Sequence, residues 1–413
     1  MRPWIAAALA ITSQLAGSYA LAQDDIRGET VLTRRRPEYE PVGINLGGFT
    51  LLPVLALREG YNSNIFATER DSKSDFITSF EPSFDLRSNW DRHALNFHGE
   101  ATIQRYATHS SEDTEDYGVA ADGKLDVLED SRLLGGLSYR RLHEARSSPD
   151  DAGGRNPTEY SVESANLAGE KEFGRLALRL DSALDRYAYE DGVGAGGATI
   201  RQSLRNRDEA QLGMRIGYEL VELRDVYVQA KVNQRNYDAG ADASGFDRDS
   251  SGYLLGAGTR YDLTGLIFLD AFLGYRHQDY DDPRLASIDG PSVNAKLTWT
   301  VTPLTTITGS ASREIQETTL SGASGYFATK TDLRADHELL RNLLLNATVG
   351  WERDAFRGVA RTDDYYLAGF GAKYLVAPEF YLSAAYGYRQ RASDQANADF
   401  QEHTVFVRAS VNF

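Results

Sequence analysis

The most constraining feature of this sequence is a polar–apolar alternation with a period of two residues, maintained over unusually long segments. Residues 226–233 place two contrasting sets on opposite faces: Val226, Val228, Ala230 and Val232 against Tyr227, Gln229, Lys231 and Asn233. Residues 211–220 and 365–374 alternate in the same way. A period of two indicates β-strands. Strands of about 10–13 residues cross a bilayer at a steep tilt, whereas soluble strands usually have about five or six residues.

Short and long breaks alternate between these segments. The short breaks lie near residues 90–91, 130–131, 173–174, 223–224, 264–265, 303–304, 341–342 and 378–379. The longer polar breaks include residues 110–115, 147–157, 191–205, 239–250 and 279–289. Tight turns at one end and long acidic loops at the other are typical of an outer-membrane barrel, and a soluble repeat array would not need this asymmetry. The pattern predicts an all-β fold, a transmembrane antiparallel up-and-down barrel of about 18 strands with both termini in the periplasm.

Composition excludes several other classes. Only 41% of the residues are hydrophobic and mean hydropathy is −0.44. Apart from the N-terminus, no apolar run approaches the roughly 20 residues of a membrane helix. The chain has no cysteine, which rules out disulfides, thiolate metal sites, a cysteine nucleophile and a lipid-anchor cysteine. The net charge of −16 argues against nucleic acid as a partner.

The N-terminus has the features of a secretory signal peptide. Arg2 precedes an apolar stretch over residues 4–11, and Ala20 and Ala22 occupy the small-residue positions before a cleavage site. We therefore predict a signal peptide over residues 1–22, the alternative being a buried helix. Residues 23–46 contain Pro37 and Pro41 and form a predicted periplasmic leader. The predicted barrel spans residues 47–413.

The C-terminal segment resembles the assembly signal of outer-membrane proteins. One apolar face leads to an aromatic residue at the end of the sequence: Val405, Val407, Ala409, Val411 and Phe413. In lipid the last strand must pair with the first, because open edges leave backbone groups unsatisfied. The expected partners are the barrel-assembly machinery, outer-membrane lipid and lipopolysaccharide. Aromatic residues near strand ends fit membrane-interface girdles: Tyr61, Trp90, Tyr106, Tyr139, Trp299, Trp351 and Tyr388.

The face opposite the apolar one would line the lumen. By parity its candidate pore-lining residues are Lys124, Arg215, Lys231, Arg235, Lys296, Arg334, Lys373, Arg408, Glu100 and Glu352. Such mixed charge is unfavourable in a dry core but ordinary in a water-filled channel. It forms either a solvated wall of compensating charges or a track for a polar polymer. Inward glycines such as Gly213, Gly256, Gly258 and Gly371 are expected to leave space along the wall.

Catalytic patterns are weak. The seven histidines are scattered, no Gly-x-Ser-x-Gly motif occurs, and His93 and His98 lack zincin spacing. The acidic run at residues 279–282 could bind a divalent cation, although such runs are more often solvated loop tips. We expect no enzymatic activity, no cofactor and no bound metal.

Residues 34–106 carry a resemblance to a known family. After the proline-containing leader and a first strand, Gly60, Tyr61, Asn64, Ile65 and Phe66 form a characteristic loop pattern. The sequence resembles the outer-membrane β-barrel porin family of Alphaproteobacteria, some of which are encoded with surface-polysaccharide export machinery. The resemblance implies a pore that takes part in polysaccharide export, with a periplasmic export protein as a further partner. Two alternatives stay open: a general diffusion porin for small polar solutes, and a plugged structural or adhesive barrel.

Overall fold

The computed structural model describes residues 28–413. The predicted signal peptide and its cleavage residues, Ala20 and Ala22, lie outside this part of the chain. Long β-strands dominate the described residues, and the elements of only two or three residues are too short to span the barrel wall. The strands of the wall are β2 (Phe49–Asn62), β3 (Asp75–Ser88), β4 (Ala94–Tyr106), β5 (Thr114–Leu128), β6 (Ser131–His143), β7 (Glu159–Phe173), β8 (Leu176–Tyr189), β11 (Arg207–Val221), β12 (Arg224–Tyr237), β13 (Ser250–Asp262), β14 (Ile267–Tyr280), β15 (Ile288–Thr302), β16 (Thr305–Gln316), β17 (Gly325–Leu340), β18 (Leu343–Arg357), β19 (Thr362–Ala377), β20 (Phe380–Ser393) and β21 (Phe400–Asn412).

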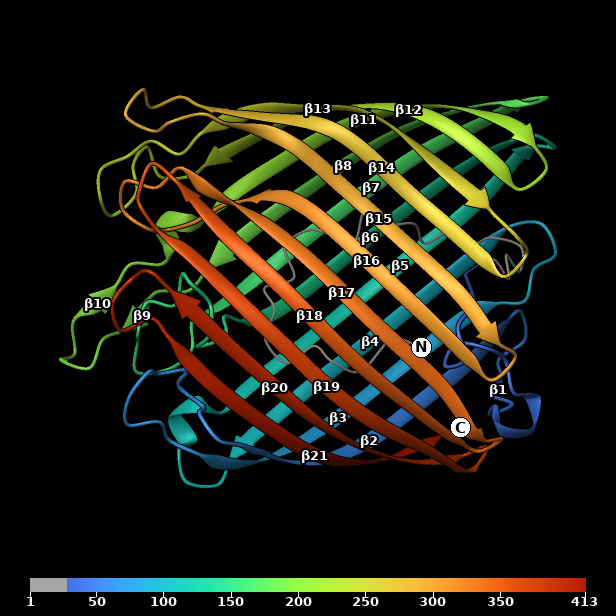
Figure 1. Cartoon of the computed structure of the whole chain (residues 1–413), viewed down its shortest axis with the longest axis horizontal. Helices are drawn as coiled ribbons and strands as arrows, with labels where there is room; N and C mark the ends of the chain where they lie inside the picture. The colour runs from blue at the N-terminus through green and yellow to red at the C-terminus, as the bar shows by residue number, and fades with distance from the viewer. Residues whose placement is uncertain (1–27) are drawn as a thin grey trace.

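These 18 strands form one closed antiparallel barrel (Figure 1). Each strand pairs with its neighbours in sequence, and β21 returns to pair with β2, with Leu55 opposite Val411. The strands have 12 to 16 residues, and closure leaves no open sheet edge to face lipid. The predicted all-β antiparallel barrel of about 18 strands is confirmed. Within the described residues, no helix is long and apolar enough to span a bilayer.

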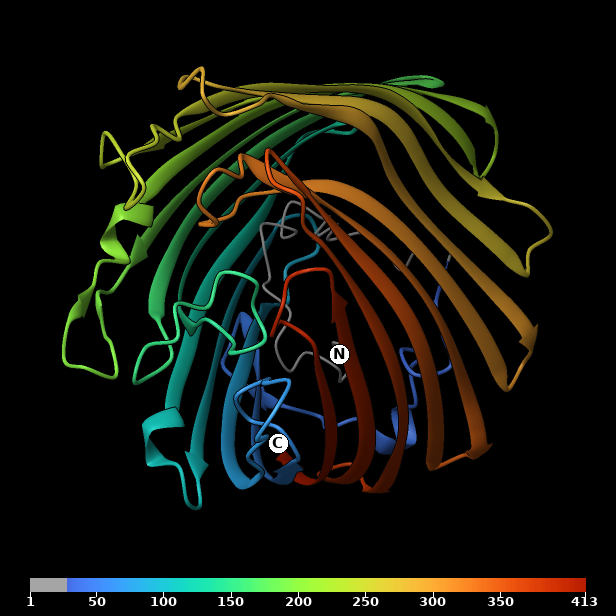
Figure 2. The same cartoon turned by 60° about the vertical axis from the view of Figure 1, so that its left-hand side comes forward.

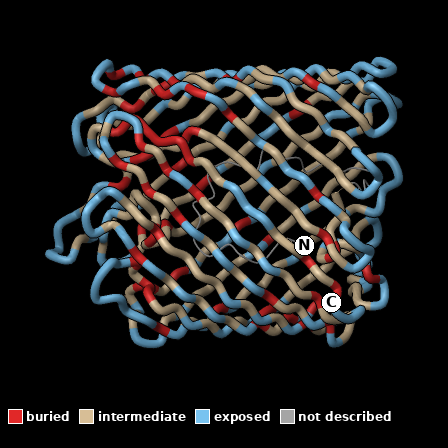
Figure 3. The backbone as a smooth tube through the Cα atoms, viewed as in Figure 1, coloured by how far each residue is buried: buried red, intermediate tan, exposed pale blue. Residues whose placement is uncertain are grey.

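The barrel has two unlike ends, which we call the turn end and the loop end (Figure 2). All eight predicted short breaks are tight connections at the turn end, for example Leu223 and Gly174 with φ of 67° and 61°. The loop end carries the longer connections, including residues 144–158, 190–206, 238–249 and 317–324. Short elements within them are η3 (Ser110–Glu112), β9 (Gly192–Val193), β10 (Thr199–Ile200) and η4 (Ser203–Arg205). Figure 3 shows many of the buried residues gathered at the loop end.

The alternation separates an outer apolar face from an inner polar one. Val228, Leu212 and Phe370 lie on the outer face and are more than half exposed. Trp90 and Trp299 are also exposed near strand ends, as expected for interface girdles.

One girdle assignment is wrong. The side chain of Tyr106 lines the internal cavity instead of the outer surface. Tyr106 is six residues from Glu100 on β4, so the alternation of side chains places both on the inward face. This alternation, and not its place at the end of a strand, determines where Tyr106 points.

Ahead of β2, the leader contains a short 3-10 helix, η2 (Pro37–Tyr39), and a two-residue strand, β1 (Ile44–Asn45). Strand β1 pairs with the start of β2, with Ile44 opposite Leu51. The leader is therefore attached to the barrel at its turn end.

Candidate functional site

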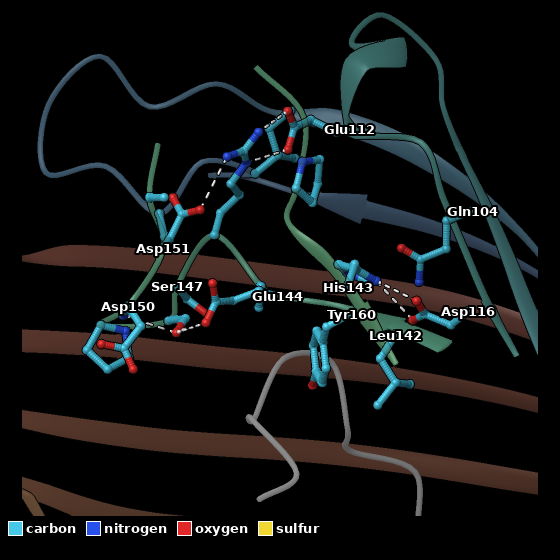
Figure 4. A pocket seen from close by; sticks show the side chains of 18 of the residues that line it. Gln104, Glu112, Asp116, Leu142, His143, Glu144, Ser147, Asp150, Asp151 and Tyr160 are labelled. Carbon is cyan, nitrogen blue, oxygen red and sulfur yellow. Dashed lines mark hydrogen bonds and ion pairs between the residues drawn. The ribbon is translucent and has the colours of Figure 1, made fainter. Parts of the chain in front are cut away.

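The candidate site is a cavity of about 1230 Å³ inside the loop-end half of the barrel. Inward side chains of the wall and residues of the loops line it (Figure 4). Of the predicted pore-lining residues, three line this cavity: Glu100, Glu352 and Arg408.

Residues 144–158, which we call the bridging loop, determine the shape of this cavity. The loop connects β6 and β7 and reaches the connection between β16 and β17, nearly half-way round the barrel. There one carboxylate oxygen of Asp150 accepts hydrogen bonds from the Thr318 hydroxyl at 2.7 Å and the Thr319 backbone N–H at 2.8 Å. The bridging loop therefore crosses the lumen and is bound to the β16–β17 connection on the opposite side of the barrel.

A second attachment joins the bridging loop to β20. The Arg389 guanidinium donates to the Ser147 hydroxyl at 2.8 Å, and Arg391 donates to the Ser147 carbonyl at 3.3 Å. Both arginines project inward from the wall, and Arg391 is 7% exposed. The crossing is thus bound at two separate places.

On its own side of the barrel, the bridging loop is held by ion pairs. Arg146 forms a two-point pair with Glu112 of η3 at 2.8 Å and contacts Asp151 at 3.3 Å. Glu144 accepts from Arg205 of η4 at 2.9 and 3.0 Å. Figure 4 shows Glu144 and Asp151 on the loop, with Glu112 reaching Arg146 from a neighbouring connection. Burial raises the pKa of Asp151, although the Arg146 guanidinium opposes that shift.

The far-side connection, residues 317–324, is itself fixed. Glu317 accepts from the guanidinium of Arg235 and from the hydroxyls of Tyr237 and Tyr280. Arg248 donates to two backbone carbonyls of the same connection, at 3.1 and 3.3 Å. Arg235, predicted as a pore-lining residue, is therefore chiefly an anchor for a loop. Its partner, the Glu317 carboxylate, is 82 residues away in the sequence, so the residues around Arg235 could not predict this role.

Most other predicted lumen charges have neighbours of opposite sign or polar partners. Glu352 contacts Lys330 at 2.8 Å, and Arg408 contacts Glu81 at 2.8 Å. The remaining contacts are Lys124 with Asp126 at 3.5 Å, Arg334 with Asp336 at 2.7 Å, and Arg215 with Gln229 at 2.9 Å. Lys373 lies 4.5 Å from the centre of the Tyr381 ring. Lys231 is half-buried and Lys296 is exposed on the inner face. This arrangement is typical of a solvated wall with compensating charges.

Four inward glycines, Gly213, Gly256, Gly258 and Gly371, do not leave open space, contrary to the expectation from sequence. A methyl group on Gly258 would lie 2.3 Å from the Tyr227 ring, and one on Gly256 would lie 2.6 Å from the Phe272 ring. These two rings lie nearly parallel, with centroids 6.3 Å apart, and Arg215 stacks over Tyr227 at 4.3 Å. The carboxylate of Asp181 and the amide of Asn346 occupy the spaces beside Gly213 and Gly371 in the same way. Glycine here admits larger neighbouring side chains.

In the acidic run at residues 279–282, the carboxylate of Asp282 is engaged within the protein. The Arg284 side chain and backbone N–H donate to Asp282, and these hydrogen bonds lower the pKa of that carboxyl. Across residues 28–413, no group of three or more His, Cys, Asp or Glu side chains is arranged to hold a metal ion.

Residues 36–413 match the family described as "Putative beta-barrel porin 2". The chain belongs to this porin family. It is a protein of the bacterial outer membrane, and porins are channels rather than enzymes. By the usual arrangement of such barrels, the turn end is periplasmic and the loop end extracellular. Comparison with curated protein sequences gives no match.

Several solved porin structures are similar to this chain at low sequence identity. Pseudomonas aeruginosa OccK2 (OpdF) is 14% identical, with a TM-score of 0.49, over 88% of this chain and 98% of that chain. A BenF-like porin from Pseudomonas fluorescens Pf-5 is 12% identical, with a TM-score of 0.49, over 89% of this chain and 100% of that chain. Pseudomonas aeruginosa OpdK with vanillate is 13% identical, with a TM-score of 0.47, over 88% and 99%.

Proposed function

We propose that the protein is a diffusion porin for small polar solutes. The bridging loop carries this proposal, because it crosses the lumen and is bound to the β16–β17 connection through Asp150 and to β20 through Ser147. A polysaccharide chain could pass only if the bridging loop stayed detached from both attachments until the whole polymer had crossed. A small solute needs only the space beside the loop. The family match supports a porin and gives no support to polysaccharide export.

The inner wall suits such solutes. A barrel of 18 strands is wide enough for an aqueous channel, so its selectivity depends on what fills the lumen. Inward charges that are mostly paired give a hydrated surface with weak individual contacts, which allow a solute to enter and leave. This proposal needs no periplasmic export protein as a partner. It retains the barrel-assembly machinery, lipid and lipopolysaccharide.

The proposal is tested with purified protein in planar bilayers and in proteoliposomes loaded with sugars of increasing length. We expect discrete conductance steps, and swelling with small sugars that fails for longer oligosaccharides. Asp150→Ala should raise the conductance and the size limit, because it releases the bridging loop from Thr318 and Thr319. Asp191→Ala is the matched control, since Asp191 accepts from Ser203 within its own loop.

Two results would contradict the proposal. Bilayers that stay silent would favour the plugged structural barrel. A deletion strain that loses surface polysaccharide while its uptake of small solutes is unchanged would restore the export function.

A further inference from the structure

Residues 28–39 of the leader contact the inner wall at the periplasmic mouth of the barrel, and β1 then joins the sheet beside β2. Figure 1 shows η2 and β1 at the turn end, opposite the long loops. A methyl group on Gly28 would lie 3.3 Å from the Phe268 ring of β14 and 3.6 Å from the Thr298 hydroxyl of β15. From there the chain passes β16 to β20 before β1 pairs with β2. The leader thus follows the inner wall around about half of the mouth.

A buried ion pair fastens the leader to the wall. The Arg36 guanidinium contacts the Glu338 carboxylate of β17 at 2.6 Å, with the two side chains 4% and 6% exposed. The same guanidinium donates to the carbonyls of Val31 at 2.8 Å and Arg34 at 3.0 Å. Arg36 therefore fixes the fold of the leader and its position on the wall together. Removal of one partner would leave a buried charge without its counter-ion, which is strongly unfavourable.

Apolar packing adds to this attachment. Val31 is fully buried against Leu344, Leu375 and Tyr381, which project inward from β18, β19 and β20. Its backbone N–H donates to the hydroxyl of Thr306, also fully buried, at 2.9 Å. A leader that merely passed through the periplasm would not bury these groups in the lumen wall.

We propose that residues 28–43 form a second constriction, at the periplasmic mouth, in series with the bridging loop and latched by the Arg36–Glu338 pair. The inference rests on the proposed channel function, because a constriction matters only where solutes pass. Resistances in series add, so solute flow is limited independently at the two ends of the lumen.

The first test measures whether the leader is docked on the inner wall, and it requires no transport measurement. The chain contains no cysteine, so Val31→Cys introduces its single thiol. In the folded protein this thiol should resist a bulky, water-soluble maleimide and react fully after denaturation. Adding Glu338→Ala should speed its labelling by at least about tenfold, because loss of the latch releases the leader. Arg35→Ala is the control, since Arg35 is 74% exposed and pairs with Glu40 of the leader itself.

The second test measures conductance. Deletion of residues 29–40 should raise the single-channel conductance roughly twofold if the two constrictions have similar resistance. Glu338→Ala should reproduce part of this rise, and the control Arg70→Ala should not, since Arg70 is 80% exposed and contacts Glu69 of its own loop at the other end of the barrel.

The outcomes separate the two proposals. If the Val31→Cys variant without any further substitution were labelled rapidly, the leader would not be docked against the inner wall, and the proposal would be overturned. Unchanged conductance after the deletion would overturn the inner constriction while leaving the porin intact. A silent native protein that conducts after the deletion would overturn the diffusion porin and the series constriction, because the leader would then be a plug. Silence in both proteins would overturn the constriction and the diffusion porin together.

Discussion

Substitution of Val228 by arginine should measure how strongly the outer face of β12 depends on lipid. Val228 is 56% exposed on the outer face, within an outward apolar run from Val226 to Val232 that is followed by the polar, exposed Gln234. With a rise of about 3.4 Å per residue and a tilt near 40°, each residue advances about 2.6 Å along the membrane normal. Val228 therefore lies about 3 Å from the centre of the apolar run, and Gln234 about 13 Å from it.

These positions set the expected cost. An arginine near the bilayer midplane destabilises a barrel by about 2–4 kcal/mol, and one at the edge of the hydrocarbon by about 0–1 kcal/mol. Val228→Arg should therefore lower the free energy of unfolding by about 2–4 kcal/mol, and Gln234→Arg by much less. Lys231→Gln, on the inner face of the same strand, should also cost little. Guanidinium titration of protein folded into phospholipid vesicles measures all three. A cost below about 1 kcal/mol for Val228→Arg, or one no larger than for Gln234→Arg, would refute the assignment of this face to lipid.

Three further predictions concern assembly, selectivity and pH. Phe413→Asp should sharply reduce insertion into the outer membrane, because β21 must be recognised and then paired with β2. Fractionation and heat-modifiable migration on gels measure insertion, and normal accumulation would contradict this prediction. Reversal of the inward cations Lys231 and Lys296 to glutamate should shift the reversal potential in a salt gradient toward cations, and an unchanged potential would remove them from the conducting path. The hydrogen bond from Arg341 lowers the pKa of Glu38 in the leader. The ionised Glu38 carboxylate therefore stabilises docking of the leader on the barrel above its unfolded pKa. This stabilisation is lost as the pH falls below about 4. Conductance should therefore rise in that range, and Glu38→Gln should remove this component of the rise.

The barrel wall follows from the sequence because each residue on it obeys a local rule. Side chains alternate between lipid and lumen, and a tight turn must follow when the strand has crossed the membrane. For this reason parity alone placed Val228 outside and Glu100 inside, and the break at residues 223–224 became a turn with Leu223 at φ 67°. The same rule, applied consistently, would have moved Tyr106 from the girdle to the cavity.

The contents of the lumen do not follow in this way, because they depend on contacts between distant residues. Asp150 meets Thr318 across 168 positions of sequence, and Arg36 meets Glu338 across 302. Nothing near Arg235 indicates that it anchors a loop through a distant carboxylate. The inward glycines show the same difficulty, since the space beside Gly258 is filled by a ring from the neighbouring strand.

This division has a mechanical consequence. The closed wall is held by a continuous ladder of strand pairs, so no single lumen contact is required for the barrel to form. The bridging loop and the leader, in contrast, are each held in the lumen by a few contacts, centred on Asp150 and Ser147 at one end and on Arg36 at the other. Substitutions at these anchors should therefore change permeability while the stability of the wall stays nearly constant. Substitutions such as Val228→Arg should do the reverse. If Asp150→Ala lowered the stability of the barrel as much as Val228→Arg, the bridging loop would be part of the wall's fold and could not serve as an independent constriction.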